Sequence, residues 1–124
     1  MFNDLFIDWN DDLVLVEGVF DALIAGNAVP ILGSTLRSGS DLLRKIVRND
    51  TPCYIALDPD AAEKERRIIQ TLLRYDVELY KVDVTGYNDV GEMSKFIFQE
   101  RKAKATFIDR DNYLLLNLLS AVKG

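Results

Sequence analysis

Short apolar runs recur along this chain, and longer stretches with helical spacing separate them. Four runs are rich in strand-forming residues: 13–16, 28–32, 52–57 and 77–82. The first run, LVLV, is apolar at every position, which is typical of a strand buried on both faces of a parallel sheet. The fourth run alternates apolar and polar residues, as a half-buried strand does. The pattern therefore predicts four strands.

The stretches between the runs carry apolar residues three and four positions apart, which predicts helices. Five are expected: over 19–26, over 41–49 with Ser40 as its cap, from Asp60 onwards, around 93–97, and after Asn112. Strands and helices thus alternate along the chain, and this order indicates an α/β fold. We expect a Rossmann-like fold, with a central parallel sheet of about four strands flanked by helices.

The length of the chain favours a single domain, residues 1–124. Residues 1–12 contain aromatic and leucine side chains at helical spacing, and we expect this segment to pack against a region upstream of the domain. Residues 105–124 are expected to form a helical C-terminal extension because leucines recur there at helical spacing.

Composition excludes several kinds of chemistry. The chain has no histidine and one cysteine, Cys53, so it lacks the residues for a Cys/His zinc site, a disulfide framework or a Ser-His-Asp triad. The net charge of −5 argues against strong binding of nucleic acid by this chain alone. No apolar stretch approaches the ~20 residues of a membrane span, and the N-terminal segment is acidic, unlike a signal peptide. We therefore expect a cytoplasmic protein without membrane contact.

Acidic residues follow the predicted strands. Glu17 ends the first strand, Asp58 and Asp60 end the third, and Asp89 and Glu92 follow the fourth. Ligands bind beyond the carboxyl ends of the strands in an open α/β sheet. If strands one and three are neighbours, three carboxylates converge there, and such a cluster repels itself unless a cation lies among the oxygens. Oxygen ligands without histidine or cysteine favour Mg²⁺ or Mn²⁺.

Structural interpretations of the same residues stay open. The Asp58–Asp60 stretch also suits a helix start, and its last aspartate with Glu63 fits a capping box. Glu17 is equally compatible with a solvated strand end. Asp21 lies one helical turn from Glu17, as a supporting or surface acid, and Gly18 leaves room there for a phosphate group.

Together, the stretches VEGVFDALIAGN, AVPILGSTL and ALDPDAAEK resemble the Toprim domain, the metal-binding module of bacterial-type primases, topoisomerases and several nucleases. Glu17 matches the family's glutamate after the first strand. Asp58 and Asp60 match its Asp-x-Asp after the third strand. The resemblance covers roughly residues 10 to 100 and is closest to the catalytic core of bacterial and phage replicative primases.

Further motifs of those primases are matched in part. Their Glu-Gly-aromatic-x-Asp motif is similar to the stretch Glu17–Asp21, with the aromatic residue displaced by one position. A Leu-Gly-Thr-like turn of the family is matched by Gly33 and Ser34, after the second predicted strand. Of a later pair of acids in the family, Asp89 is matched, whereas a glycine replaces the second acid and Glu92 follows it.

The resemblance implies a DNA primase, with Mg²⁺- or Mn²⁺-dependent nucleotidyl transfer that makes RNA primers for DNA replication. It implies Glu17, Asp58 and Asp60 as catalytic residues and metal ligands, Asp89 as a further ligand, and Gly18, Asp21, Gly33, Ser34 and Glu92 as supporting or substrate-binding residues. Its partners would be nucleoside triphosphates, a single-stranded DNA template held by other primase domains, and a replicative helicase. As a fragment or a split subunit, the chain alone is expected to be inactive. The alternatives are a small metal-dependent Toprim nuclease and a Toprim interaction domain without activity.

Overall fold

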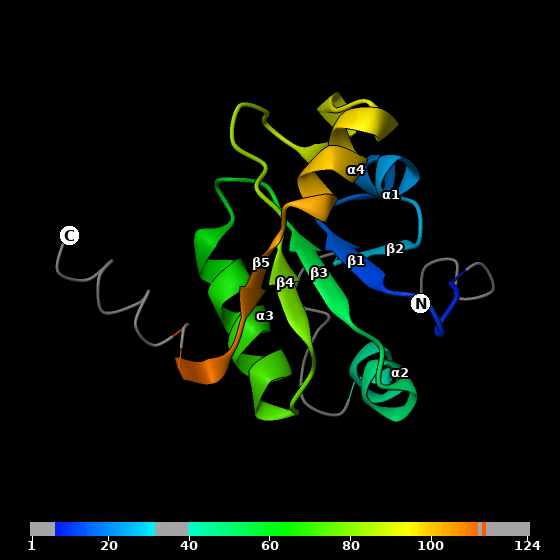
Figure 1. The fold of residues 1–124 in the computed structure, drawn as a ribbon, viewed down its shortest axis with the longest axis vertical. Helices are drawn as coiled ribbons and strands as arrows, with labels where there is room; N and C mark the ends of the chain where they lie inside the picture. Colours follow the sequence, from blue (N-terminus) through cyan, green and yellow to red (C-terminus); the bar gives the residue numbers. More distant parts are fainter. Residues whose placement is uncertain (1–6, 32–39, 112, 114–124) are drawn as a thin grey trace, which may run out of the picture.

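The computed structural model describes residues 7–31, 40–111 and 113 (Figure 1). Its elements are β1 (Leu13–Val16), α1 (Val19–Ala25), β2 (Ala28–Pro30), α2 (Asp41–Asn49), β3 (Cys53–Ala56), α3 (Ala62–Arg74), β4 (Leu79–Lys81), the 3-10 turn η2 (Val90–Glu92), α4 (Lys95–Ala103) and β5 (Thr106–Ile108). The sheet has the order β2-β1-β3-β4-β5. Strands β1 to β4 are parallel, and β5 runs antiparallel to β4. The predicted α/β fold with a parallel sheet flanked by helices is confirmed.

Strand β1 lies inside the sheet, between β2 and β3. All four of its residues are buried, as the uninterrupted apolar run predicts. Val16 lies opposite Pro30 on one side and Ala56 on the other. Proline cannot donate to a further ladder, which agrees with the position of β2 at the edge of the described sheet. Because parallel strands end at the same edge, the residues that follow Val16 and Ala56 come together.

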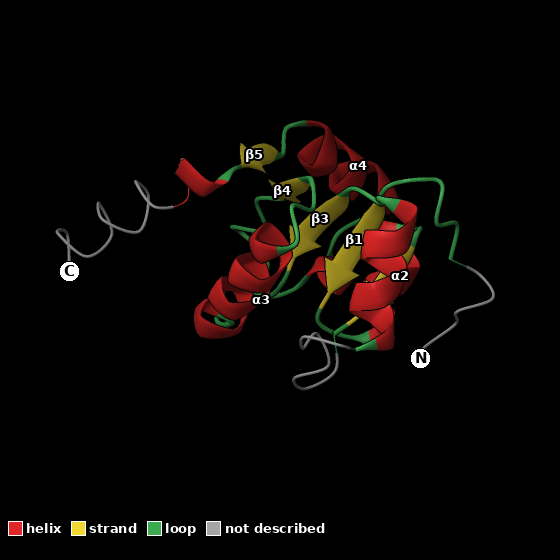
Figure 2. Ribbon diagram, turned by 90° about the horizontal axis from the view of Figure 1, so that it is seen from below, coloured by secondary structure: helices red, strands yellow, loops and turns green. Residues whose placement is uncertain are grey.

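Helices cover both faces of the sheet (Figure 2). On one face, α2 and α3 bury side chains such as Ile46 and Leu72 against Leu15 and its neighbours. On the other face, α1 contributes two small alanines and α4 contributes Phe98, which is fully buried beside Val16. The small residues of α1 bring its backbone close to the sheet, directly after the carboxyl end of β1.

Serine side chains fix the starts of two helices. The Ser40 hydroxyl accepts the Leu43 N–H at 3.2 Å, so the predicted cap of α2 is confirmed. The Ser94 hydroxyl accepts the Ile97 N–H at 3.1 Å and starts α4. The helix expected around residues 93–97 therefore begins after Met93, and a single 3-10 turn precedes it.

The C-terminal part differs from the sequence prediction. The expected helical extension, 105–124, starts instead with strand β5, whose residue Phe107 lies opposite Tyr80 of β4. The two rings are 5.5 Å apart, and this packing supports a strand of three residues that is too short to show a period of its own. The apolar segment at 114–119, predicted as a helix, lies outside the described residues.

The described part of the N-terminal segment packs on the domain itself. Ile7 is buried, and Trp9 is partly buried against the core beneath α2 and α3. The Trp9 carbonyl accepts a hydrogen bond from the Thr51 hydroxyl at 2.8 Å, which ties the segment to the start of β3. Within the described ranges, no helix combines the length and the apolar character needed to cross a membrane.

Candidate functional site

Two acidic residues follow the neighbouring strands β1 and β3. Glu17 comes directly after Val16, and Asp58 comes two residues after Ala56, which pairs with Val16 in the sheet. Figure 1 shows the two strands side by side and pointing the same way. The prediction that strands one and three are neighbours is confirmed. We call the surface formed by these two strand ends and the residues next to them the acidic edge.

One carboxylate oxygen of Asp58 accepts no hydrogen bond among the described residues. Its Oδ1 is buried and has no hydrogen-bond partner among the described residues. The pKa of Asp58 is raised to about 6, first by burial and then by the negative charge of nearby carboxylates. Those carboxylates are, in falling order of effect, Asp21, Glu17, Asp89 and Asp60. An unpaired carboxylate oxygen among like charges favours a cation at that position.

Glu17 already has a cation beside it. The Nζ of Lys64, in the first turn of α3, lies 2.5 Å from Glu17 Oε2 and donates a second hydrogen bond to the Ile31 carbonyl at 2.7 Å. Only about a quarter of each charged side chain is exposed, 26% for Lys64 and 25% for Glu17. Glu17 is therefore not a freely solvated strand end, because Lys64 fixes its carboxylate next to the end of β2.

Asp21 is a buried carboxylate that joins two segments. It lies in α1 and is 6% exposed. Its Oδ2 accepts the Gly18 N–H at 3.0 Å, and its Oδ1 accepts the Gly91 N–H at 2.7 Å. The prediction that Asp21 supports the site agrees better with these contacts than the prediction of a surface acid. The side chain links the Glu17 motif to the turn that carries Asp89.

The Asp89 turn is held by its own side chains. Asp89 accepts the Glu92 N–H at 3.0 Å, and Glu92 accepts the Asn88 N–H at 2.6 Å. Both carboxylate oxygens of Glu92 thus accept hydrogen bonds from Asn88 within the turn. A Cβ at Gly91 would lie 3.1 Å from Asp21 Oδ1 and 3.2 Å from Asp89 Oδ1. A larger residue at 91 would crowd both carboxylates.

The remaining candidates differ in how they relate to the acidic edge. Asp60 is exposed, and the residue after it is the N-cap of α3, with no side-chain hydrogen bond at the cap. The capping box proposed for Asp60 is therefore not formed. Gly18 has an extended backbone, and a Cβ there would lie 3.7 Å from its nearest neighbour, so a side chain fits. Gly33 and Ser34 lie outside the described residues.

The acidic edge fits Mg²⁺ or Mn²⁺ in the kind of donor that it offers. Its side chains present carboxylate oxygens, and Asp58 has one free. The predicted convergence of three carboxylates is not seen, however: the part of the chain that the structure describes has no group of three or more acidic, cysteine or histidine side chains that could hold an ion as it stands. In this arrangement Lys64 pairs with Glu17, and Asp60 is exposed.

Sequence reasoning missed Lys64. A lysine on a charged helix is normally a solvated residue, and the sequence does not show which carbonyl or carboxylate it meets. The available signal is its position in the sequence, because Lys64 lies in the first turn of the helix that follows Asp58 and Asp60.

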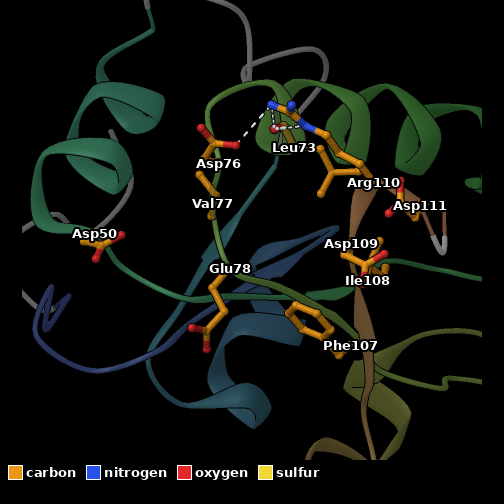
Figure 3. A pocket seen from close by; sticks show the side chains of 10 residues that line it. All are labelled: Asp50, Leu73, Asp76, Val77, Glu78, Phe107, Ile108, Asp109, Arg110 and Asp111. Atoms are coloured by element: carbon orange, nitrogen blue, oxygen red, sulfur yellow. Dashed lines mark hydrogen bonds and ion pairs between the residues drawn. The ribbon is translucent and has the colours of Figure 1, made fainter. Parts of the chain in front are cut away.

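A pocket of about 610 Å³, called the hollow below, lies away from the acidic edge, at the amino ends of the parallel strands (Figure 3). Its lining residues are Asp50, Leu73, Asp76, Val77, Glu78, Phe107, Ile108, Asp109, Arg110 and Asp111. Arg110 donates to the Leu73 carbonyl at 2.9 Å and pairs with Asp76 at 3.1 Å, so its charge is already balanced. Ligands of open α/β sheets bind at the other end of the strands, and we place the site at the acidic edge.

The chain is similar to a solved primase structure. No family model matches the sequence, and no curated protein gives a significant match. The crystal structure of the zinc-binding and RNA polymerase domains of Aquifex aeolicus primase is similar, with a TM-score of 0.62 and 28% sequence identity. The match covers 77% of this chain and 26% of the primase chain, so this chain spans about a quarter of that length. The chain has a primase-like α/β fold.

Proposed function

We propose that this chain is the Toprim catalytic module of a DNA primase and takes part in joining nucleotides into RNA primers. Three observations support the proposal. The fold is primase-like, the stretches Glu17–Asp21 and Asp58–Asp60 resemble the Toprim motifs, and both stretches begin at the carboxyl ends of neighbouring strands.

The observation that carries the proposal is the free oxygen of Asp58. A buried carboxylate oxygen without a donor, among other carboxylates, is unfavourable unless a cation or a proton satisfies it. For an aspartate with a purely structural role, an unsatisfied buried oxygen next to other carboxylates would only lower stability. Nucleotidyl transfer requires divalent cations, and the acidic edge has the charge and the oxygen donors to attract them.

In this proposal, Asp58, Asp60, Asp89 and Glu17 hold Mg²⁺ or Mn²⁺. Bound there, such ions would supply positive charge to the reacting phosphoryl group. The chain's own residues prepare the position: Asp21 ties the Asp89 turn to α1 through two amide hydrogen bonds. Glu17 lies at the end of β1, where it can accept a cation or a proton from the reacting hydroxyl.

The proposed partners are nucleoside triphosphates, a single-stranded DNA template and a replicative helicase. The net charge of −5 is unfavourable for gripping a template, so other primase domains would hold the DNA. The match to the Aquifex aeolicus primase covers 26% of that chain, which is consistent with a module that works beside other domains. Isolated, the chain would bind metal and nucleotide phosphate weakly and make no primer.

The experiment is RNA primer synthesis by the complete primase, in which this chain works with its template-binding domains. Glu17→Gln keeps the shape of the side chain but loses the charge, and we expect primer synthesis to fall by about 10²-fold or more. Glu63→Gln is the matched control, because Glu63 is exposed and pairs with Arg66 on the outer surface of α3. The control should keep full activity.

Nuclease activity is measured in the same reaction. Glu17-dependent cleavage without synthesis would assign the chain to the nucleases of the Toprim family. If the wild type is active and Glu17→Gln is equally active, Glu17 is a bystander. A complete protein that neither extends nor cleaves would favour an interaction domain.

A further inference from the structure

Lys64 occupies a place in the acidic edge that the Toprim motifs do not assign. Its ammonium donates to two acceptors that follow different strands, the Glu17 carboxylate after β1 at 2.5 Å and the Ile31 carbonyl after β2 at 2.7 Å. The side chain comes from the first turn of α3. One lysine thus connects β1, β2 and α3 at the point where the proposed cation would bind.

This contact differs from the ion pairs on the surface. Arg44 and Asp41, for example, pair with side chains that are 67% and 77% exposed, and pairs of that kind contribute little. The Lys64–Glu17 pair is mostly shielded from water and is reinforced by a backbone carbonyl, so its geometry is fixed. Lys64 nevertheless leaves one oxygen of Asp58 unsatisfied, since Oδ1 has no hydrogen-bond partner among the described residues.

We propose that Lys64 is a positioning residue that serves as the resident counter-ion of Glu17, and that a divalent cation at the acidic edge competes with its ammonium. The inference rests on the proposed function, because it takes the acidic edge to be the cation site. A divalent ion near Glu17 is repelled by the ammonium and competes with it for the negative charge of that carboxylate. Lys64 thereby holds Glu17 in place in the metal-free protein and weakens the binding of the first ion.

The test is a calorimetric titration of the chain with MnCl₂, on the wild type, Lys64→Met and Lys64→Arg. Methionine keeps the length of the side chain and removes the charge, so Lys64→Met should bind Mn²⁺ at least about tenfold more tightly than the wild type. Lys64→Arg keeps the charge and should retain the affinity of the wild type. A purely structural lysine predicts the opposite, since its loss would loosen the site and weaken binding.

Lys102→Met is the matched control. Lys102 pairs with Asp12 at 2.6 Å, with exposures of 19% and 29%, and Asp12 precedes β1 at the opposite end of the strand. Both methionine variants remove one positive charge from a half-buried pair, and both should lower the melting temperature without metal. Lys102→Met should leave the affinity for Mn²⁺ unchanged.

The outcomes separate this inference from the proposed function. Tighter binding in Lys64→Met, but not in Lys64→Arg or Lys102→Met, supports the inference, including where the wild type itself binds too weakly to detect. If the wild type binds Mn²⁺ and Lys64→Met binds it equally or more weakly, the inference is overturned and the cation site stands. If no variant binds Mn²⁺, both the inference and the proposed cation site are wrong.

Discussion

Asp58 and Glu17 carry the same functional group at neighbouring strand ends, and their surroundings separate them. Lys64 lies against Glu17 and holds that carboxylate in place. Asp58 has a free oxygen and four carboxylates within electrostatic reach. Pairs of acids in different environments commonly divide the work of a site. In the proposed cation site, Asp58 therefore offers an oxygen without a partner, and Glu17 is the carboxylate for which an ion would compete with Lys64.

The surroundings of Asp58 predict a pH dependence of stability. Its pKa is about 6 in the folded chain, above the ordinary value of 3.8, so the folded state binds the proton more tightly than the unfolded state. Protonation of Asp58 therefore contributes to the free energy of unfolding. This contribution is fully present below about pH 4 and is lost as the pH rises through about 6. In metal-free buffer, Asp58→Asn should therefore exceed the wild type in unfolding free energy at pH 7.5, on the order of 1 kcal/mol because water screens part of the charge.

Urea unfolding at pH 4 and pH 7.5, with a chelator present, measures this difference. The advantage of Asp58→Asn should be small at pH 4, where the wild-type carboxyl is protonated. A variant that is less stable than the wild type at pH 7.5 would show that Asp58 is satisfied by a donor and is not a strained acid awaiting a cation.

At the scale of elements, Asp21 connects α1 to the turn η2. The two N–H groups that it accepts, from Gly18 and Gly91, are 73 positions apart in the chain, and both flank the acidic edge. This buried carboxylate keeps the Asp89 turn near β1. Gly91 has to be small there, because a Cβ would press against both Asp21 and Asp89.

Asp21→Asn should lower the unfolding free energy by about 1–3 kcal/mol. The amide keeps one oxygen acceptor, but its NH₂ group faces an N–H donor that is then left unpaired in a buried position. Urea unfolding at pH 7 measures the change. Asp41→Asn is the control, since Asp41 is 77% exposed and should change stability by less than about 0.5 kcal/mol. Equal effects of the two substitutions would contradict the linking role of Asp21.

The elements that the sequence predicts well are those with a strong local pattern. The strand Leu13–Val16 and the helix Asp41–Asn49 have the predicted bounds. A continuous apolar run and a capped amphipathic stretch are both recognisable from the local sequence. Strand β5 has three residues and exists through its pairing with β4, which no local pattern reveals. The Lys64 contact likewise depends on how α3 meets the ends of β1 and β2, and only the fold supplies that information.

At the scale of the whole molecule, the two ends of the sheet differ. The carboxyl ends of β1 and β3 carry the acidic edge, while the amino ends border the hollow next to β5, where Arg110 already pairs with Asp76. The primase-like fold favours the first end as the working one, since ligands of such sheets bind at the carboxyl ends.

The most direct test is crystallography of this chain grown with MnCl₂, using the anomalous signal of manganese to locate the ion. We expect a manganese peak at the carboxyl ends of β1 and β3, at a coordination distance of about 2 Å from Asp58 Oδ1. The peak should disappear in Asp58→Asn crystals grown in the same way. Manganese bound only at the hollow near Asp76 and Asp109, with nothing at Asp58, would contradict the assignment of the acidic edge as the cation site.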